Sequence, residues 1–278
     1  MAKIFQCGRY RFSFENGKPA LVIGILNITP DSFSDGGHYV HLESALIHAE
    51  QMIADGVDII DIGGESTRPG SQAVTLEEEL RRVIPVVYAL RDCGVPLSVD
   101  TNKPEVMREA LLAGADMIND IHGFSSAEAI AAVAGSDAGL CVMHMQKSPG
   151  DMQIQPVYED VCAEVGQFLQ QRADALIEAG VDMRQLCIDP GFGFGKTLEH
   201  NVALFRGLGQ LESESDFPLL VGVSRKTMIG QLTGKPVEQR CAGSVAAALA
   251  AVKHGAHIVR VHDVAETVDA LKVWQALQ

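Results

Sequence analysis

The sequence has no run of apolar residues as long as a membrane-spanning helix needs, and its first residues lack the apolar stretch of a signal peptide. Basic residues are outnumbered: 22 lysines and arginines stand against 36 aspartates and glutamates, for a formal net charge of −14. This balance argues against a surface for nucleic acid or anionic membranes, although local charge can still serve a small anionic substrate. We therefore expect a cytoplasmic protein that binds neither nucleic acid nor membranes.

Other signals are missing as well. The six cysteines show no Cys-x-x-Cys spacing and lie mostly in apolar segments, which is typical of reduced, buried thiols. A His-Glu-x-x-His motif is absent, which disfavours a zinc hydrolase with a protein-built metal cage. We find no internal repeat, low-complexity segment or interdomain linker. Because single α/β barrels often have about this length, residues 1–278 are predicted to form one domain.

The chain does contain eight short, mostly apolar runs that each end in a polar residue. Such runs are typical of buried parallel strands, and helical patterns lie between most of them. Eight β-α units close into a (β/α)8 TIM barrel, whose chemistry lies at the carboxyl ends of the strands. The sequence therefore predicts a ring of polar residues around one mouth of the barrel, made of Asn27, Asp61, Asp100, Asn119, His144, Asp189, Ser224 and His262.

The remaining elements follow from periodicity and turn signals. Thr75 with Glu78 three residues later has the pattern of a capping box. Tyr10, Phe12 and Phe14 alternate with polar residues ahead of an Asn-Gly turn signal at 16–17, so residues 1–20 are predicted to be a β-hairpin that closes the bottom of the barrel. Helices are predicted over about 41–55, 75–91, 103–113, 126–134, 157–179, 199–211, 225–232, 240–254 and 264–276.

The segment Asp189-Pro-Gly-Phe-Gly-Phe-Gly-Lys-Thr197 resembles two nucleotide motifs but matches neither. A Walker A loop needs one more residue before its Gly-Lys pair, and the glycines do not follow the G-x-G-x-x-G spacing. What remains is a carboxylate made rigid by Pro190, followed by glycines that let the backbone and Phe192 or Phe194 approach a ligand. A plain tight turn is the alternative.

The last two strands supply cations and hydroxyl groups. Ser224 and Thr227 flank a helix start that could bind an anion, although simple N-capping by Ser224 is an equal alternative. Arg260 and His262 lie on one face of a strand, because side chains alternate with a period of two. A cation that faces the interior of a barrel must meet an anion or a π-face, so we expect Arg260 to be functional.

Three polar residues at strand ends point to a planar ligand. Asp100, Asn119 and Asp189 could accept the N–H groups of a guanine or pterin edge, whereas any one alone could be a structural cap. Asn27 offers a neutral oxygen that suits Mg²⁺ shared with substrate phosphates. The turn-rich loops 29–37 and 63–71 are candidate lids over this mouth, or else ordinary connections.

Over nearly its whole length the chain resembles the dihydropteroate synthase family. The strongest matching segments are Gly24-Ile-Leu-Asn-Ile-Thr-Pro-Asp-Ser-Phe-Ser-Asp-Gly-Gly37, Asp61-Ile-Gly-Gly-Glu-Ser-Thr-Arg-Pro-Gly70, Asp189-Pro-Gly-Phe-Gly-Phe-Gly-Lys196 and Ser224-Arg-Lys226. The resemblance implies a transferase of folate biosynthesis. It would join 6-hydroxymethyl-7,8-dihydropterin diphosphate to p-aminobenzoate, releasing pyrophosphate and 7,8-dihydropteroate.

The resemblance also implies residue roles. The pterin would be bound by Asp100, Asn119, Met143, Asp189, Lys226 and Arg260. The diphosphate would be bound by Asn27, Arg68, Arg260 and His262, with Mg²⁺ on Asn27. The p-aminobenzoate slot would be lined by Phe33, Pro69, Gly193, Phe194 and Lys226, with its carboxylate near Thr227. Thr67 and Ser224 are further expected substrate-binding residues. The catalytic set would be Asn27, Arg68, Lys226, Arg260 and His262.

In the implied mechanism, pyrophosphate leaves first and the aniline nitrogen attacks the resulting pterin methylene cation. The resemblance further implies a homodimer that sulfonamides target. Two alternatives remain at this point: a pterin-dependent methyltransferase barrel, and a non-catalytic barrel that only binds pterins. The run Glu65–Pro69 argues against the first, because a methyltransferase expels no diphosphate. The presence of Asn27, Arg68, Lys226 and His262 argues against the second.

Overall fold

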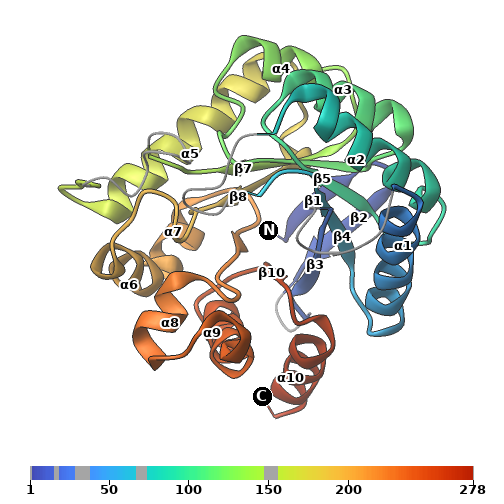
Figure 1. Ribbon diagram of the computed structural model, residues 1–278. Helices are drawn as coiled ribbons and strands as arrows, with labels where there is room; N and C mark the ends of the chain where they lie inside the picture. Colours follow the sequence, from blue (N-terminus) through green and yellow to red (C-terminus); the bar gives the residue numbers. More distant parts are fainter. Residues whose placement is uncertain (1, 16–18, 29–37, 67–73, 147–155, 278) are drawn as a thin grey trace.

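The computed structural model describes residues 2–15, 19–28, 38–66, 74–146 and 156–277. Its centre is a sheet of eight parallel strands with helices around it (Figure 1). The strands are β3 (Leu21–Asn27), β4 (Ile59–Gly63), β5 (Leu97–Asp100), β6 (Met117–Asp120), β7 (Gly139–Met143), β8 (Leu186–Asp189), β9 (Leu220–Val221) and β10 (Ile258–Val261).

The sheet closes on itself. Its strand order is β8-β7-β6-β5-β4-β3-β10-β9, and a parallel bridge between Ile188 and Leu219 joins the two outer members. The first barrel strand, β3, pairs with the last, β10, and Leu21 lies opposite Ile258 in this pair. The predicted (β/α)8 TIM barrel is therefore confirmed.

Helices connect successive strands and cover the outside of the barrel. They are α1 (His38–Ala54), α2 (Leu76–Leu90), α3 (Pro104–Ala113), α4 (Ala127–Val133), α5 (Val161–Glu178), α6 (Leu198–Arg206), α7 (Leu208–Glu214), α8 (Thr227–Thr233), α9 (Cys241–Lys253) and α10 (Val264–Ala276). The described residues also form two short 3₁₀ helices, η2 (Met183–Gln185) and η3 (Val237–Gln239). No helix in these described ranges has the length and apolar character that a membrane crossing requires.

Most helix predictions are correct to within a few residues, and the differences have local causes. The helix predicted over 199–211 is broken at Gly207 into α6 and α7, where a Cβ atom would lie 2.6 Å from the Cys162 sulfur. The start of α5 is later than predicted because Asp160 caps it. Thr75 does cap α2 by accepting a hydrogen bond from the Glu78 amide, but the Glu78 carboxylate pairs with arginines of its own helix instead of completing the box.

The N-terminal hairpin exists, but its turn is not where the sequence predicted it. β1 (Lys3–Cys7) pairs antiparallel with β2 (Tyr10–Phe14), so the turn is Gly8-Arg9, and residues 16–18 lie outside the described part. Gly8 has a φ of +55° and sits so close to Asp116 that a Cβ atom would lie 2.8 Å from its carboxylate. This contact fixes the turn more strongly than the Asn-Gly signal does.

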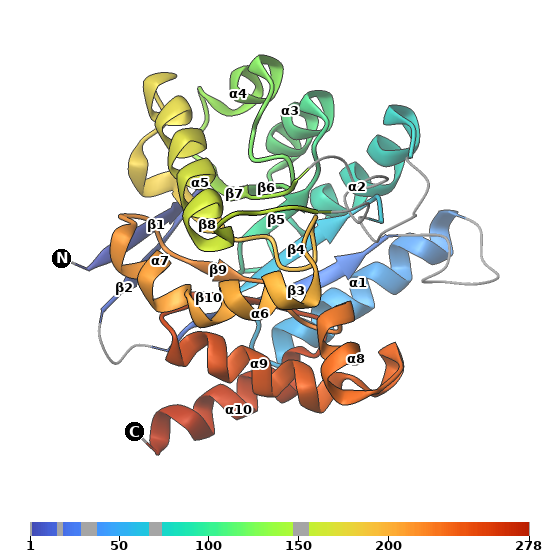
Figure 2. The same ribbon diagram turned by 90° about the vertical axis from the view of Figure 1, so that its left-hand side faces the viewer.

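The hairpin fills one end of the barrel, as predicted. Figure 2 shows β1 and β2 together at that end. Phe5 and Cys7 are fully buried in an apolar layer with one side chain from each of seven of the eight barrel strands, namely Ile23, Ile59, Met117, Cys141, Cys187, Leu220 and Ile258. Gly139 makes room for the plug, because a Cβ atom there would lie 2.6 Å from the Phe5 ring. All six cysteines are free thiols, and Cys7, Cys141 and Cys187 are buried.

The barrel interior changes character toward its other end. Two residues beyond the level of the apolar layer, the inward positions of the strands carry polar side chains that are nevertheless buried: Asp61, Asp100, Asn119 and Asp189. The prediction that Asp61 ends its strand is wrong. β4 continues to Gly63, so Asp61 lies in mid-strand and deeper than expected.

Candidate active site

The centre of the polar end is an arginine shared by two carboxylates. Arg260 lies on β10, and its Nε donates to Oδ2 of Asp61 at 2.6 Å. A terminal nitrogen of the same guanidinium donates to Oδ2 of Asp100 at 2.8 Å. Burial disfavours the charged form, but the two carboxylates more than compensate and raise the pKa of Arg260. The expectation that this interior cation must meet anions is confirmed.

The same carboxylates keep acceptor atoms without partners. Asn119 donates from its amide nitrogen to Asp61 Oδ2 at 3.3 Å. Oδ1 of Asp61, Oδ1 of Asp100 and Oδ1 of Asn119 are buried and find no hydrogen-bond partner among the described residues. Buried acceptors are costly unless donors reach them. Three of them together therefore favour a ligand that presents several N–H groups.

Asp189 ends β8 and is 4% exposed. Its Oδ1 accepts the Gly191 amide at 2.8 Å. Burial raises the pKa of Asp189, and the cations of Lys226 and Arg260 oppose that rise. Burial likewise raises the pKa of Asp100 to about 7. Arg260 opposes this rise, and the nearby carboxylate of Asp61 adds to it.

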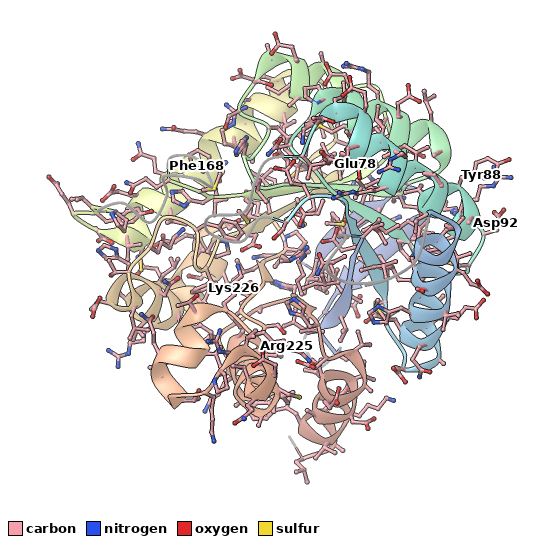
Figure 3. All side chains as sticks on the ribbon, viewed as in Figure 1. Glu78, Tyr88, Asp92, Phe168, Arg225 and Lys226 are labelled. Carbon is pink, nitrogen blue, oxygen red and sulfur yellow. The ribbon has the colours of Figure 1, made fainter. Side chains whose placement is uncertain are left out.

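Lys226 reaches back to the glycine-rich loop after β8. It precedes α8 and is labelled, with Arg225, in Figure 3. Its ammonium donates to the carbonyl oxygen of Phe192 and lies 4.3 Å from the centroid of the Phe194 ring. Burial lowers the pKa of Lys226 to about 8, while Asp189 opposes the change.

Phe194 in turn belongs to a small apolar cluster with Ile121, Met143 and Met145. A Cβ atom at Gly193 would lie 3.3 Å from the Lys226 chain. The loop therefore packs against the Lys226 side chain, which a plain tight turn does not require. Through these contacts, one wall of the candidate site is formed by Met143, Gly193, Phe194 and Lys226. The loop's approach to a ligand stays a prediction.

Ser224 holds His262 rather than a helix end. The backbone N–H of His262 donates to the Ser224 hydroxyl at 3.1 Å, and His262 Nδ1 lies 3.1 Å from the same oxygen. Lys226 occupies the N-cap position of α8 and makes no side-chain cap hydrogen bond. The alternative that Ser224 simply caps this helix is therefore wrong. Thr227 is the exposed first residue of α8.

Asn27 ends β3 beside the carboxylate pair. It lies opposite Gly63 of β4, and a Cβ atom at Gly63 would lie 3.6 Å from Asn27 Oδ1 and 3.9 Å from Asp100 Cβ. Its half-buried amide oxygen suits Mg²⁺, a hard cation that keeps several waters and is completed by substrate phosphates. The described acidic and thiol groups that could share an ion, Cys241, Asp263 and Glu266, are a separate cluster, and Arg225 already pairs with Asp263.

One member of the predicted ring lies elsewhere. His144 follows β7 directly after inward-facing Met143, so strand alternation turns it away from the barrel axis. Its ring packs against Phe168 and Tyr158, and its Nδ1 lies 2.9 Å from the amine of Lys196. Its prediction as a mouth residue is therefore wrong. Phe33, Thr67, Arg68 and Pro69 lie outside the described residues, and their expected roles stay predictions.

Two structural partners were missed by sequence reasoning. Asp61 was placed in the ring but given no role toward Arg260 or Asn119, although a carboxylate inside an apolar strand run is a signal in itself. Arg225 adopts a φ of +56° and pairs with Asp263, while its amide donates to the Ser244 hydroxyl at 2.8 Å. No local sequence pattern predicts these contacts of Arg225, because Ser244 lies on α9 and Asp263 at the start of α10.

Comparison with known proteins agrees with this geometry. Residues 23–262 match the family described as "Pterin binding enzyme". The dihydropteroate synthase of Neisseria meningitidis serogroup C is 51% identical over 99% of this chain and 97% of its own. The structure of Burkholderia cenocepacia dihydropteroate synthase with 7,8-dihydropteroate superposes with a TM-score of 0.90, at 52% identity, covering 100% of this chain and 97% of that one.

The Xanthomonas albilineans dihydropteroate synthase with 4-aminobenzoic acid gives a TM-score of 0.91 at 51% identity, covering 100% of this chain and 99% of that one. These similarities lend no support to the methyltransferase or non-catalytic alternatives. Together with the buried acceptors around Arg260 and the loop that meets Lys226, they show that the chain belongs to the pterin-binding enzymes and, within them, to the dihydropteroate synthase family.

Proposed function

We propose that this chain condenses 6-hydroxymethyl-7,8-dihydropterin diphosphate with p-aminobenzoate, giving 7,8-dihydropteroate and pyrophosphate. The observation that carries the proposal is the group of buried, unpartnered acceptors on Asp61, Asp100 and Asn119 beside a shared guanidinium. A reduced pterin presents an amino group and ring N–H groups along one edge, so its donors match these acceptors.

The pterin would lie flat among these groups. Asp189, Asp100 and Asn119 accept from the ring, and the ammonium of Lys226 donates to it. Arg260 places its guanidinium against the ring face, held in position by Asp61, and Met143 packs on the apolar side. The polar side chains among them are already held through their other atoms before the ligand arrives, so little side-chain entropy is lost on binding.

The p-aminobenzoate slot would lie next to the pterin, toward the start of α8. The wall made by Gly193, Phe194 and Lys226 packs on the aromatic ring. The carboxylate of this substrate meets the N–H groups at the start of α8 near Thr227, with Ser224 behind them. Phe33 and Pro69 would complete the slot.

The diphosphate would extend toward β3 and β4. Asn27, Thr67, Arg68, Arg260 and His262 bind it in this proposal, and Ser224 orients the His262 ring. Asn27 would hold Mg²⁺, which when bound neutralises charge on the departing pyrophosphate. Arg260 connects the two halves of the site, because it faces both the ring and the leaving group.

The chemistry then needs no covalent enzyme intermediate. The C–O bond to the diphosphate breaks, the electron pair leaves with pyrophosphate, and a pterin methylene cation remains. The aniline nitrogen donates its electron pair to that carbon and then releases a proton. Asp100 and Asp189 stabilise the cation, while Arg68, Arg260 and His262 stabilise the growing negative charge on the leaving group.

The decisive experiment incubates the protein with dihydropterin diphosphate, p-aminobenzoate and Mg²⁺ and measures dihydropteroate and pyrophosphate. Formation of both products in equal amounts supports the proposal; pterin binding without product contradicts it. We further propose that residues 1–278 act as one pterin-binding unit, as a homodimer in the cytoplasm. Light scattering of the purified protein tests the dimer.

A further inference from the structure

Lys196 is the last residue of the loop that follows β8, and it is buried, with 3% of its surface exposed. Its Nζ lies 2.9 Å from Nδ1 of His144, 2.9 Å from the carbonyl oxygen of Gly191 and 3.1 Å from that of Phe194. An ammonium has three N–H groups, so each meets one acceptor. Burial lowers the pKa of Lys196 to about 7, while Asp189 opposes the change, so the amine is charged below that pH. This buried group is fully hydrogen-bonded, yet the reaction as described does not use it.

His144 is suited to act as the third acceptor. Its ring packs edge-on against Phe168 of α5 at a centroid distance of 5.0 Å, on the outer side of the barrel and not in its mouth. Burial and the charge of Lys196 lower the pKa of His144 to about 3, so the ring is neutral. Nδ1 then accepts from Lys196 and the ring proton resides on Nε2.

The loop held by Lys196 is already confined by its glycines. Gly191 has a φ of +70°, and a Cβ atom there would lie 1.8 Å from the His144 carbonyl oxygen. A Cβ atom at Gly195 would lie 2.7 Å from the Gln146 carbonyl oxygen. The loop backbone therefore lies directly on residues 144–146, and Lys196 ties its carbonyls to the same segment.

The opposite side of the loop holds Lys226. The Phe192 carbonyl accepts from the Lys226 ammonium, and the Phe194 ring lies beneath it. Phe194 is also the residue whose carbonyl Lys196 binds. A movement of the loop would therefore displace both groups that position Lys226.

Lys196 also acts on Asp189 through its charge. The carboxylate of Asp189 faces Lys226 before α8, Arg260 on β10, the thiol of Cys141 on β7, and Lys196 from behind its own loop. The three cations oppose the rise in the pKa of Asp189 that burial causes. Removal of one of them must favour the protonated, neutral carboxyl group.

We propose that Lys196 is a positioning residue of the synthase reaction: it clamps the glycine-rich loop against His144 so that the Phe192 carbonyl and Phe194 ring hold Lys226, and it stabilises the ionised form of Asp189. The inference rests on the proposed function where kcat/KM for the pterin diphosphate is the measured quantity. It concerns a residue that touches neither substrate nor the reacting atoms.

The test replaces the ammonium while keeping an unbranched chain, in Lys196→Met. We expect the affinity for 6-hydroxymethylpterin, measured by calorimetry, and kcat/KM for the pterin diphosphate to fall at least about tenfold, the typical effect of losing charge-assisted hydrogen bonds. The loss should be larger at pH 6 than at pH 8, because Lys196 in the wild-type protein carries its charge at pH 6 and has largely lost it at pH 8. Only the charged amine favours the ionised form of Asp189. Lys3→Met, which removes an ammonium paired with Glu212 at the hairpin end, should change neither quantity.

Two histidine variants keep the inference testable if Lys196→Met does not fold. His144→Asn retains an acceptor near the Nδ1 position and should stay close to wild type, whereas His144→Leu removes it and should reproduce the pterin defect. A purely structural role would lower stability in Lys196→Met without the pH-dependent loss of affinity, and that result would overturn the inference. Equal pterin affinities of His144→Asn and His144→Leu would overturn it too.

The two proposals can fail separately. A wild-type protein that forms no dihydropteroate contradicts the synthase function, but pterin affinity still decides the role of Lys196. A wild-type protein with full activity and a Lys196→Met variant within about twofold of it contradicts only the positioning role.

Discussion

Nε of Arg260 lies 2.6 Å from Oδ2 of Asp61, which fixes the guanidinium from below while Asp100 holds its other edge at 2.8 Å. Two carboxylates on neighbouring strands thus determine the plane of one arginine. The plane matters because a guanidinium packs on a flat ring only when it is parallel to that ring.

Asp61→Asn should therefore weaken pterin binding even though Asp61 is fully buried. The amide keeps the shape but loses the charge, and the expected cost is about 1.5–3 kcal/mol, or at least about tenfold in pterin affinity by calorimetry. Asp58→Asn is the matched control, since that carboxylate binds the Val22 amide on the outer side of the barrel. Unchanged pterin affinity in Asp61→Asn would show that Asp100 alone orients Arg260.

Asp189→Asn should also damage pterin binding. The amide accepts fewer hydrogen bonds and turns a donor toward the ring's donors, so affinity should fall at least about tenfold. Asp182→Asn, at the partly exposed N-cap of η2, should leave affinity unchanged. Wild-type-like affinity in Asp189→Asn would remove this residue from the pterin site.

The pH dependence of kcat/KM should be bell-shaped. Asp100 has a pKa of about 7 and gains a proton, and so loses acceptor capacity, as the pH falls through that value. Lys226 has a pKa of about 8 and loses its charge as the pH rises through that value. Activity is therefore expected to be highest between these limits.

Lys226→Arg separates the two limbs of this profile. Arginine stays protonated, so whatever activity remains should no longer decline on the alkaline side, while the acidic limb should persist. An alkaline limb unchanged in this variant would assign it to another group.

Gly191→Ala should disable the loop after β8. The new Cβ would lie 1.8 Å from a backbone oxygen in a left-handed conformation, so something must move. We expect a loss of stability above about 2 kcal/mol, seen in chemical denaturation, and loss of pterin binding. Gly135→Ala, where nothing lies within 4 Å, should change stability by less than about 0.5 kcal/mol.

Arg68→Ala should weaken use of the diphosphate but leave binding of unphosphorylated pterin nearly unchanged, because Arg68 is expected to meet only the leaving group. Calorimetry with both ligands checks this. Equal losses for both would mean that Arg68 supports the ring or the fold.

The barrel was predictable because strand patterns and turn signals are local. Eight apolar runs separated by helical spacing leave few other topologies. Details that depend on long-range contacts were not predictable. Gly207, which separates α6 from α7, lies against a cysteine on α5, and Gly8 in the hairpin turn lies against Asp116.

The site was predicted in part for the same reason. Inward polar residues at strand ends, such as Asp100 and Asp189, follow from the strand period. His144 was misplaced because a one-residue difference reverses the face of a strand. The burial of Lys196 could not be foreseen, since its acceptors are two carbonyls and an imidazole whose positions depend on the folded loop.

The hairpin plug also affects the order in which the molecule can assemble. Phe5 packs in a layer whose other members extend to Ile258, about 250 residues later, and β3 finds its second neighbour only in β10. Contacts of such sequence separation form late, because the loop entropy must be lost before they contribute. Until β10 is made, a growing chain exposes the apolar floor of the barrel and an open strand edge on β3. The chain is therefore most open to association with other chains before its last strand is added.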